Sequence, residues 1–246
     1  VGVFDADTTI ENVQVNNILV ECMGTAQASG VANTNHGTIK NVSVNGLIKG
    51  TVVAGFVNTN HGTICFDDTL SSVYALDAIL RGQTKIGGIA IYNYGKITGS
   101  SNLTQIKAEL RWNIVKKDFA SLEDEFMIAG IAVVNAGSNA VIENICTLTN
   151  IIDAVNAAGA VGHFGNYNGN NGGAIKNCVI NTTIRTIAGR VGITTYSGKS
   201  NVVGGIVAVV SEGCVNSSIE NVSGSITVNN TSVQGFSYDI LYGLNY

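Results

Sequence analysis

The stretch Gly30–Ile64, GVANTNHGTIKNVSVNGLIKGTVVAGFVNTNHGTI, contains nearly the same ten residues twice. The segment GVANTNHGTI at 30–39 returns as GFVNTNHGTI at 55–64, a shift of 25 positions. Self-similarity at a distance of roughly 20 to 50 residues is typical of stacked repeat architectures. The rest of the chain contains looser copies of this stretch, so the sequence predicts a solenoid built from one repeating coil.

The repeating unit has four recognisable parts. It combines a Gly-plus-apolar segment, a turn that ends in Gly, an Ile-x-Asn-Val motif and a second alternating segment. The spacing between units varies from 25 to 45 residues, as expected for a solenoid that accepts insertions as loops. The Ile that anchors each unit occurs at Ile10, Ile39, Ile64, Ile97, Ile142, Ile175 and Ile219.

The segments of the unit are predicted to be β strands that turn a corner at the Asn. They are short, rich in Val, Ile and Thr, and alternate with a period of two residues. The alternation changes phase at the Asn, and Asn tolerates the left-handed backbone conformation that such a corner requires. If the coils stack about 4.8 Å apart, the corner amides can hydrogen-bond to one another as a buried ladder. The predicted ladder consists of Asn12, Asn41, Asn144, Asn177 and Asn221.

The predicted fold class is therefore all-β: a right-handed parallel β-helix of about seven coils, in a single domain over residues 1–246. Only 12% of the residues are charged and none is Pro, against about 25% and about 5% in typical domains. Asn occurs 29 times, which suits a β structure with many short turns. The 13 basic residues form no cluster, so a nucleic-acid surface is not expected, and no apolar run reaches the roughly 18 residues that span a bilayer.

The segment GTIKNVSVNGLIKGTVVAGFVNTNHG at 37–62 resembles the GLUG-type repeats of bacterial cell-surface and secreted proteins. The likeness is good over Gly30–Gly62 and weaker at Gly87–Ile97, Gly173–Val179, Gly204–Gly213 and Ser218–Ile226. Such repeats occur in adhesins, in large surface proteins and beside protease domains. The resemblance implies a solenoid in an extracellular or cell-surface setting, and it carries no catalytic residues.

Two segments depart from the repeat and are expected to be surface excursions. The first, near 101–128, holds nine of the 30 charged residues and the only Trp. Within it, alternation over Ile106–Ile114 predicts a half-buried strand, and Asp118–Phe126 is predicted to form a short helical turn. The second, near 166–173, reads NYNGNNGG and is predicted to be a flexible loop.

The chain starts and stops at the same phase of the repeat. Neither end offers an amphipathic capping helix, whereas natural solenoids normally cap their ends. Uncapped β edges invite pairing with another chain. We therefore expect either that the ends meet between molecules and build a filament, or that the chain is a piece of a longer solenoid.

Two columns of side chains could in principle bind a metal ion. His36 and His61 occupy the same turn slot, followed by Tyr94, but two His without a carboxylate or thiol are a weak metal signal. Asp5 and Asp7 align with Asn33 and Asn35, and then with Asn58 and Asn60, which is hard-ligand chemistry suited to Ca²⁺. Because these are also ordinary turn residues, no metal or other cofactor is predicted.

The cysteines and the sequons add little to this reading. Cys22, Cys65, Cys146, Cys178 and Cys214 show no metal spacing, and Cys178 takes a slot that holds Val elsewhere, so it is expected to be buried. Two of the sequons, Asn41 and Asn221, are predicted ladder positions, where burial excludes a glycan. The other sequons are at Asn102, Asn181, Asn216, Asn229 and Asn230.

No catalytic constellation is evident. Asp67 and Asp68 are neighbours that would point to opposite sides of a strand, and Glu123–Glu125 is expected to be a solvated face. The cations Arg81, Lys85, Arg111, Arg185 and Arg190 are expected to lie in excursions without acidic partners. The aromatic residues that could stack on sugars are too scattered to define a site: Tyr92, Tyr94, Trp112, Tyr167 and Tyr196.

The sequence thus predicts a non-catalytic extracellular structural protein. It would self-associate end to end through uncapped solenoid ends, or form part of an adhesin stalk that contacts surface glycans. The alternative is a carbohydrate-binding or polysaccharide-degrading β-helix protein.

Overall fold

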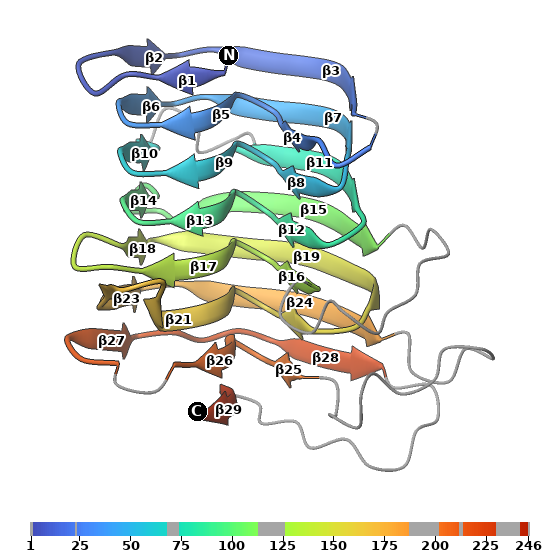
Figure 1. Ribbon diagram of the computed structural model, residues 1–246, viewed down its shortest axis with the longest axis vertical. Coiled ribbons are helices and arrows are strands. Elements are labelled where there is room, and N and C mark those ends of the chain that lie inside the picture. The colour runs from blue at the N-terminus through green and yellow to red at the C-terminus, as the bar shows by residue number, and fades with distance from the viewer. Residues whose placement is uncertain are drawn as a thin grey trace.

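The computed structural model describes residues 2–22, 24–67, 74–112, 126–186, 202–211, 214–229 and 242–245. These residues form a parallel β-helix, as predicted (Figure 1). Each full coil contains four strands, and each strand pairs in parallel with the equivalent strand of the next coil. The coils therefore build four sheets, named A to D here, that run along the solenoid axis.

Sheets A and B contain the Gly strands and the Ile strands of the repeat. Sheet A comprises β1 (Val3–Phe4), β5 (Ala32–Asn35), β9 (Val57–Asn60), β13 (Ala90–Asn93), β17 (Ala132–Ala136), β21 (Val161–Tyr167), β26 (Val207–Val210) and β29 (Tyr242–Asn245), with β22 (Asn170–Asn171) beside β21. Sheet B comprises β2 (Thr9–Glu11), β6 (Thr38–Lys40), β10 (Thr63–Cys65), β14 (Lys96–Thr98), β18 (Val141–Glu143), β23 (Gly173–Lys176) and β27 (Ser217–Glu220).

Sheets C and D complete each coil. Sheet C contains the longest strands: β3 (Gln14–Glu21), β7 (Ser43–Lys49), β11 (Leu76–Gly82), β15 (Thr104–Trp112), β19 (Ile145–Ala154), β24 (Val179–Thr186) and β28 (Ile226–Asn229). Sheet D contains short strands: β4 (Gln27–Ser29), β8 (Val52–Ala54), β12 (Lys85–Gly87), β16 (Met127–Ala129), β20 (Ala157–Ala158) and β25 (Val203–Gly204).

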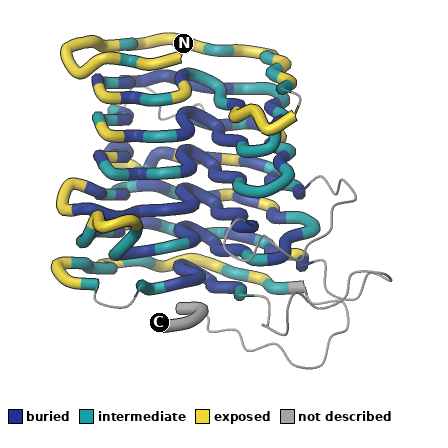
Figure 2. Tube along the Cα trace, in the orientation of Figure 1, coloured by how far each residue is buried: buried dark blue, intermediate teal, exposed yellow. Residues whose placement is uncertain are grey.

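The predicted Ile anchors stack in a single column of sheet B. The pairing runs without a break from Ile10 through Ile39, and on to Ile219. From Ile39 to Ile175 these side chains are fully buried, and they pack with the inward residues of the other sheets in one core along the axis. The first coil is more exposed than those that follow (Figure 2).

The corner at each predicted Asn is confirmed by the backbone. All five have a positive φ: 58° at Asn12, 51° at Asn41, 58° at Asn144, 51° at Asn177 and 52° at Asn221.

The ladder predicted at these corners is present in part, and most of its members are not buried. Asn41 Nδ2 donates to Asn12 Oδ1 (3.3 Å) and Asn221 Nδ2 donates to Asn177 Oδ1 (3.1 Å), but Asn144 donates to the Gly99 carbonyl instead. Asn41 alone among the five is buried. A corner on the outside of a coil exposes its side chain to water, so the amides are not forced to pair.

A second, fully buried ladder lies at the end of the Gly strands. Asn35 Nδ2 donates to Asn60 Oδ1 (2.8 Å), Asn60 to Asn93 (2.8 Å), and Asn93 to Asn135 (2.7 Å). All four residues are 0% exposed. Their amides also donate to backbone carbonyls of the next coil, as Asn60 does to Lys96 (3.2 Å). Each Asn follows the Gly of its strand by five residues, a sequence signal that marks this ladder.

The glycines that open these strands form a column of close backbone contacts. A Cβ on Gly55 would overlap the carbonyl oxygen of Gly88, and one on Gly130 would overlap that of Gly159. The column comprises Gly30, Gly55, Gly88, Gly130, Gly159 and Gly205. The repeat therefore requires Gly at this position because neighbouring coils approach too closely for any side chain.

The two expected excursions are corrected in part. The predicted half-buried strand is present as β15, but it is a regular member of sheet C and ends at Trp112. The helical turn predicted at 118–126 lies, except for Phe126, outside the described residues. The NYNGNNGG segment is ordered as an antiparallel hairpin between β21 and β22, with Asn168 and Gly169 at its turn.

All five cysteines are free thiols. Cys178 is fully buried, as predicted, and burial raises the pKa of its thiol to about 11. The part of the chain that the structure describes contains no helix long and apolar enough to cross a bilayer.

Candidate functional site: a groove on sheet C

Sheet C presents the broadest outer face of the solenoid. Most of its strands contain seven to ten residues, whereas those of sheet D contain two or three. Side chains alternate along these strands, so Val44, Gly46 and Ile48 point into the core while Asn45, Leu47 and Lys49 point outward. In-register stacking then arranges the outward side chains in columns that cross the strands.

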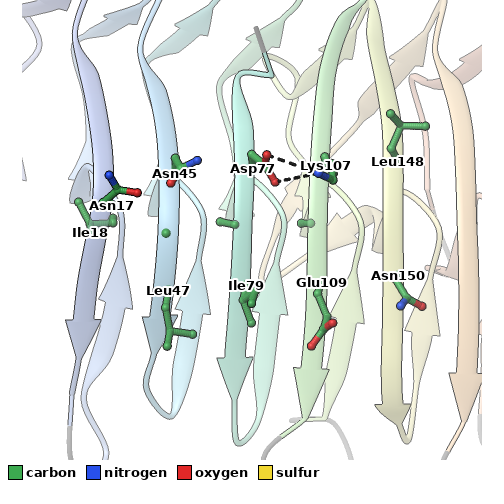
Figure 3. Close-up of a pocket in the computed structure, with 13 residues that line it drawn as sticks. Asn17, Ile18, Asn45, Leu47, Asp77, Ile79, Lys107, Glu109, Leu148 and Asn150 are labelled. Atoms are coloured by element: carbon green, nitrogen blue, oxygen red, sulfur yellow. Dashed lines mark hydrogen bonds and ion pairs between the residues drawn. The ribbon is translucent and has the colours of Figure 1, made fainter.

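A shallow groove of about 680 Å³ follows two of these columns across β3, β7, β11, β15 and β19 (Figure 3). One column contains Asn45, Asp77, Lys107 and Leu148. The other contains Leu47, Ile79, Glu109 and Asn150, and it is continued beyond the groove by Leu19 on β3. The groove therefore runs parallel to the solenoid axis and is lined by one pair of outward residues from each coil.

The polar groups of the groove include one ion pair. Lys107 Nζ lies 3.4 Å from Asp77 Oδ1 and 3.5 Å from Oδ2, and it sits over the ring of Tyr74 at 5.3 Å. The two side chains are 52% and 41% exposed, so solvent screens the pair and its net contribution to stability is small. The charges are therefore accessible to a ligand.

The groove also exposes apolar surface. Six large hydrophobic residues of the described chain are exposed, and three of them lie on this face: Leu19 (66%), Ile79 (38%) and Leu148 (37%). Single exposed aliphatic residues are unremarkable, but Leu19, Leu47 and Ile79 are consecutive members of one column. Apolar surface flanked by amides and carboxylates is suited to a ligand with both apolar and hydroxyl faces.

The carboxylates of the groove fit binding better than acid–base catalysis. Asp77 and Glu109 share the outer face of neighbouring strands, a pair that the sequence alone did not bring together. A glycosidase general acid sits in a pocket that keeps it protonated. Asp77 is exposed and ion-paired instead. The arrangement can accept hydrogen bonds from hydroxyl groups without a chemical step.

The predicted His column is present in the turn between sheets A and B. The rings of His36 and His61 stack at 4.9 Å with an interplanar angle of 3°, and His61 stacks on Tyr94 at 5.2 Å. A shared metal would need convergent nitrogens at about 2.0–2.1 Å, and parallel rings at this separation do not converge. Burial, and then the charge of His36, lower the pKa of His61.

The structure brings together three of the aromatic residues that seemed scattered along the sequence. Tyr92 lies 6.3 Å from Tyr94 and 5.9 Å from Tyr167, which in turn lies 5.7 Å from His163. Burial, with the neighbouring phenols, raises the pKa of Tyr94 to about 12. Trp112 is instead buried against Phe126, and Tyr196 lies outside the described residues.

The Asp and Asn column considered for Ca²⁺ does not converge. Phe4 pairs with Asn35, so Asp5 follows in the slot of His36 rather than in that of Asn33. Asn35 and Asn60 point into the core ladder, while Asp5 and Asp7 are exposed. Among the described residues no three His, Cys, Asp or Glu side chains gather where they could hold a metal ion.

The sequons divide by exposure. Asn41 is 4% exposed, which excludes a glycan there as expected, whereas Asn221 is exposed, contrary to expectation. Asn102 and Asn216 are also exposed.

The chain matches no family model, no curated protein and no solved structure. The likeness to GLUG-type repeats is therefore carried by the quoted motifs alone. The groove on sheet C was not predicted, because its paired residues are 28 to 41 positions apart in the sequence and their register depends on loops of unequal length.

Proposed function

We propose that this chain is a non-catalytic, extracellular β-solenoid that binds an extended carbohydrate chain along the groove of sheet C. The observation that carries the proposal is the groove itself, to which β7, β11, β15 and β19 each contribute two outward side chains in columns along the axis. These side chains are amides, carboxylates, one Lys and aliphatic groups, so a linear polymer lying along the axis can contact one coil after another. A low charge content and the resemblance to repeats of cell-surface proteins support the extracellular setting.

The rigid scaffold supports binding without a conformational change. Most groove residues lie on β7, β11, β15 and β19, which pair on both sides in the middle of sheet C, whereas Asn17 and Ile18 lie on β3, which pairs with one described strand. Ordering of the site therefore costs little when the ligand binds. The solenoid would act as a spacer that presents a preformed surface, as an adhesin stalk does.

A polysaccharide-binding screen tests the proposal. The purified chain is expected to bind at least one linear polysaccharide on a glycan array and to be retarded by it in affinity electrophoresis. The double substitution Ile79→Glu and Leu148→Glu adds charge to the apolar part of the groove and is expected to abolish binding. Val215→Glu, at an exposed Val outside the groove, is the matched control and is expected to bind normally.

Two results would contradict the proposal. A blank screen removes carbohydrate binding. A polysaccharide that binds but is shortened on incubation with the chain contradicts the non-catalytic assignment, as chromatography of the polymer before and after incubation will show.

A second candidate function is end-to-end self-association. β1, β2, β3 and β4 each pair with only one strand, so the other edge of each is unpaired among the described residues. Such edges are templates for a further strand, and the last coil of a second copy of this chain has matching periodicity. Electron microscopy of the purified chain is expected to show filaments whose length increases with concentration. Stable monomers at high concentration would contradict self-association and leave the groove proposal intact.

A further inference from the structure

A column of cations borders the groove on sheet C. Lys49 on β7 pairs with Arg81 on β11, and Arg81 pairs with Arg111 on β15. After Ile152 on β19 the column continues with Arg185 on β24. These residues follow the Leu47 column by two positions, so they point outward on the same face. The sequence placed these arginines in separate excursions, and the structure corrects that expectation.

Stacking like charges on neighbouring strands is unfavourable unless something compensates them. Adjacent strands lie about 4.8 Å apart, and like charges directly opposite destabilise a sheet. Two of the cations have acidic neighbours: Lys49 lies 3.5 Å from Glu21, and Arg111 lies 3.4 Å from Asp153. Glu21 and Asp153 thus neutralise the two ends of the run, Lys49 and Arg111. Neither acid pairs with the residue at its centre.

Arg81 is the uncompensated centre. It forms no ion pair with any residue that the structure describes, although it lies between two cations. Its Nε is buried and has no hydrogen-bond partner among those residues. A buried donor without an acceptor is costly, so the arrangement around Arg81 is unfavourable for both its charge and its hydrogen bonding.

The two observations together specify the charge and the shape of the ligand. The column offers one cation on each of three neighbouring strands, β7, β11 and β15, in a line along the axis next to a groove that suits a hydroxyl-rich chain. Asp77 and Glu109 lie on the groove side of the column, and the one cation inside the groove, Lys107, is paired with Asp77, so the stacked cations lie along one edge. This distribution fits a polymer that carries its anionic groups along one side, and it disfavours nucleic acid, as does the net charge of -4.

We propose that the ligand of the groove is an acidic polysaccharide, lying along the solenoid axis with its anionic groups on Lys49, Arg81 and Arg111. This inference rests on the proposed carbohydrate function and names its ligand class. The anionic groups are carboxylates or sulfate esters, both of which accept paired hydrogen bonds from a guanidinium group. The ligand would then supply the negative charge that the centre of the column lacks.

Binding of four polymers tests this inference: a polyuronate, dextran sulfate, uncharged dextran and single-stranded DNA. The polyuronate or dextran sulfate is expected to bind, and to bind more weakly as salt is added, because exposed charges are screened. Whichever of the two binds more tightly identifies the anionic group. Arg81→Gln is expected to weaken binding about tenfold or more, since a charge-assisted contact is lost. Lys96→Gln removes an exposed cation on sheet B and is expected to leave binding unchanged.

The outcomes separate this inference from the proposed function. If dextran binds as tightly as the acidic polymers, the inference is overturned while carbohydrate binding stands. If DNA binds as tightly as the acidic polysaccharides, the surface is a non-specific polyanion site and the inference is also overturned. The same conclusion follows if Arg81→Gln and Lys96→Gln weaken binding equally. If no polysaccharide binds, both proposals fail. Thermal melting followed by circular dichroism will show whether the Arg81→Gln and Arg81→Lys variants are folded, and so whether a loss of affinity reflects a loss of structure. The Arg81→Lys variant keeps the charge and is expected to bind better than Arg81→Gln.

Discussion

Asparagine serves two different purposes in the solenoid, at the corners and in the buried ladder, and the two depend on different properties of the residue. At Asn41 and Asn177 the backbone requires a positive φ, which Asn tolerates. At Asn60 and Asn93 the backbone is an ordinary strand, and the amide group satisfies its hydrogen bonds inside a dry core. Substitutions can therefore separate the two roles.

Replacing Asn60 by Ala tests the buried ladder. The substitution removes the acceptor of Asn35 Nδ2 and the donor to Asn93 Oδ1, both at 2.8 Å. Leaving two buried polar groups with fewer partners is expected to lower the free energy of unfolding by about 2–4 kcal/mol. Asn16→Ala, at an exposed position of β3, is the control and should change it by less than about 0.5 kcal/mol. Urea denaturation measures both changes. If Asn60→Ala and Asn16→Ala lower the free energy of unfolding equally, the buried ladder is contradicted.

Asn177 tests the corner without the complication of burial, because it is exposed with a φ of 51°. Asn177→Gly is expected to be close to neutral, since Gly adopts this conformation readily. Asn177→Val should cost about 1–2 kcal/mol, because a β-branched residue is strained there. Thermal melting of the two variants measures the difference. A Val variant as stable as the Gly variant would show that the corner is not left-handed.

The stacked His pair predicts a pH dependence of stability. The pKa of His61 is lowered from 6.5 in the folded chain, by burial and then by His36. The unfolded chain therefore takes up this proton first as pH falls through 6.5, so stability decreases there and levels off below the folded pKa. Above pH 6.5 both states are neutral at this site and the effect disappears.

His61→Tyr removes the titrating group and keeps a ring in the column, as Tyr94 does in the next coil. The loss of melting temperature between pH 7.5 and pH 5 is expected to be smaller in this variant than in the native chain. An identical pH profile for the two proteins would contradict the lowered pKa of His61 in the folded chain.

At the scale of the element, the Gly strand is defined by a close approach between coils. A Cβ on Gly130 would overlap the carbonyl oxygen of Gly159 and approach Thr149. Gly130→Ala is therefore expected to lower the free energy of unfolding by about 3 kcal/mol or more. Gly2→Ala places its methyl group in open space and should be neutral. If the Gly130→Ala variant has the same melting temperature as the native chain, the coils are less tightly stacked than the structure indicates.

The elements differ in how far the sequence could predict them. The Ile column of sheet B follows directly from the repeat, and all seven predicted anchors pair in register. The corner conformation follows from the phase change at the Asn. The buried ladder was missed because Asn35 and Asn60 precede a turn, and Asn is so common in turns that its burial was not suspected.

The groove and its cationic border could not be predicted for a different physical reason. Lys49, Arg81 and Arg111 are 32 and 30 residues apart, and the intervening loops have unrelated lengths. Their alignment depends on the register of whole coils, which the buried Ile and Asn columns impose. Contacts in the core thus determine which outer side chains lie next to one another. The outer residues take no part in those contacts.

At the scale of the whole molecule, the solenoid converts a sequence repeat into lines of like side chains along one axis. The core lines, of Ile, Gly and Asn, fix the register of the coils. The outer lines on sheet C take no part in these core contacts, and they supply the polar and aliphatic columns of the groove and the cationic column beside it. A rigid core with a variable outer face is the arrangement that an extended binding surface requires.

A crystal structure of the chain with a bound oligosaccharide from the best polymer of the screen tests the central claim most directly. The account predicts that the oligosaccharide lies parallel to the solenoid axis across β7, β11 and β15, between the Asn45 and Lys49 columns. An oligosaccharide bound on sheet A, sheet B or sheet D, or bound across the axis, would contradict it.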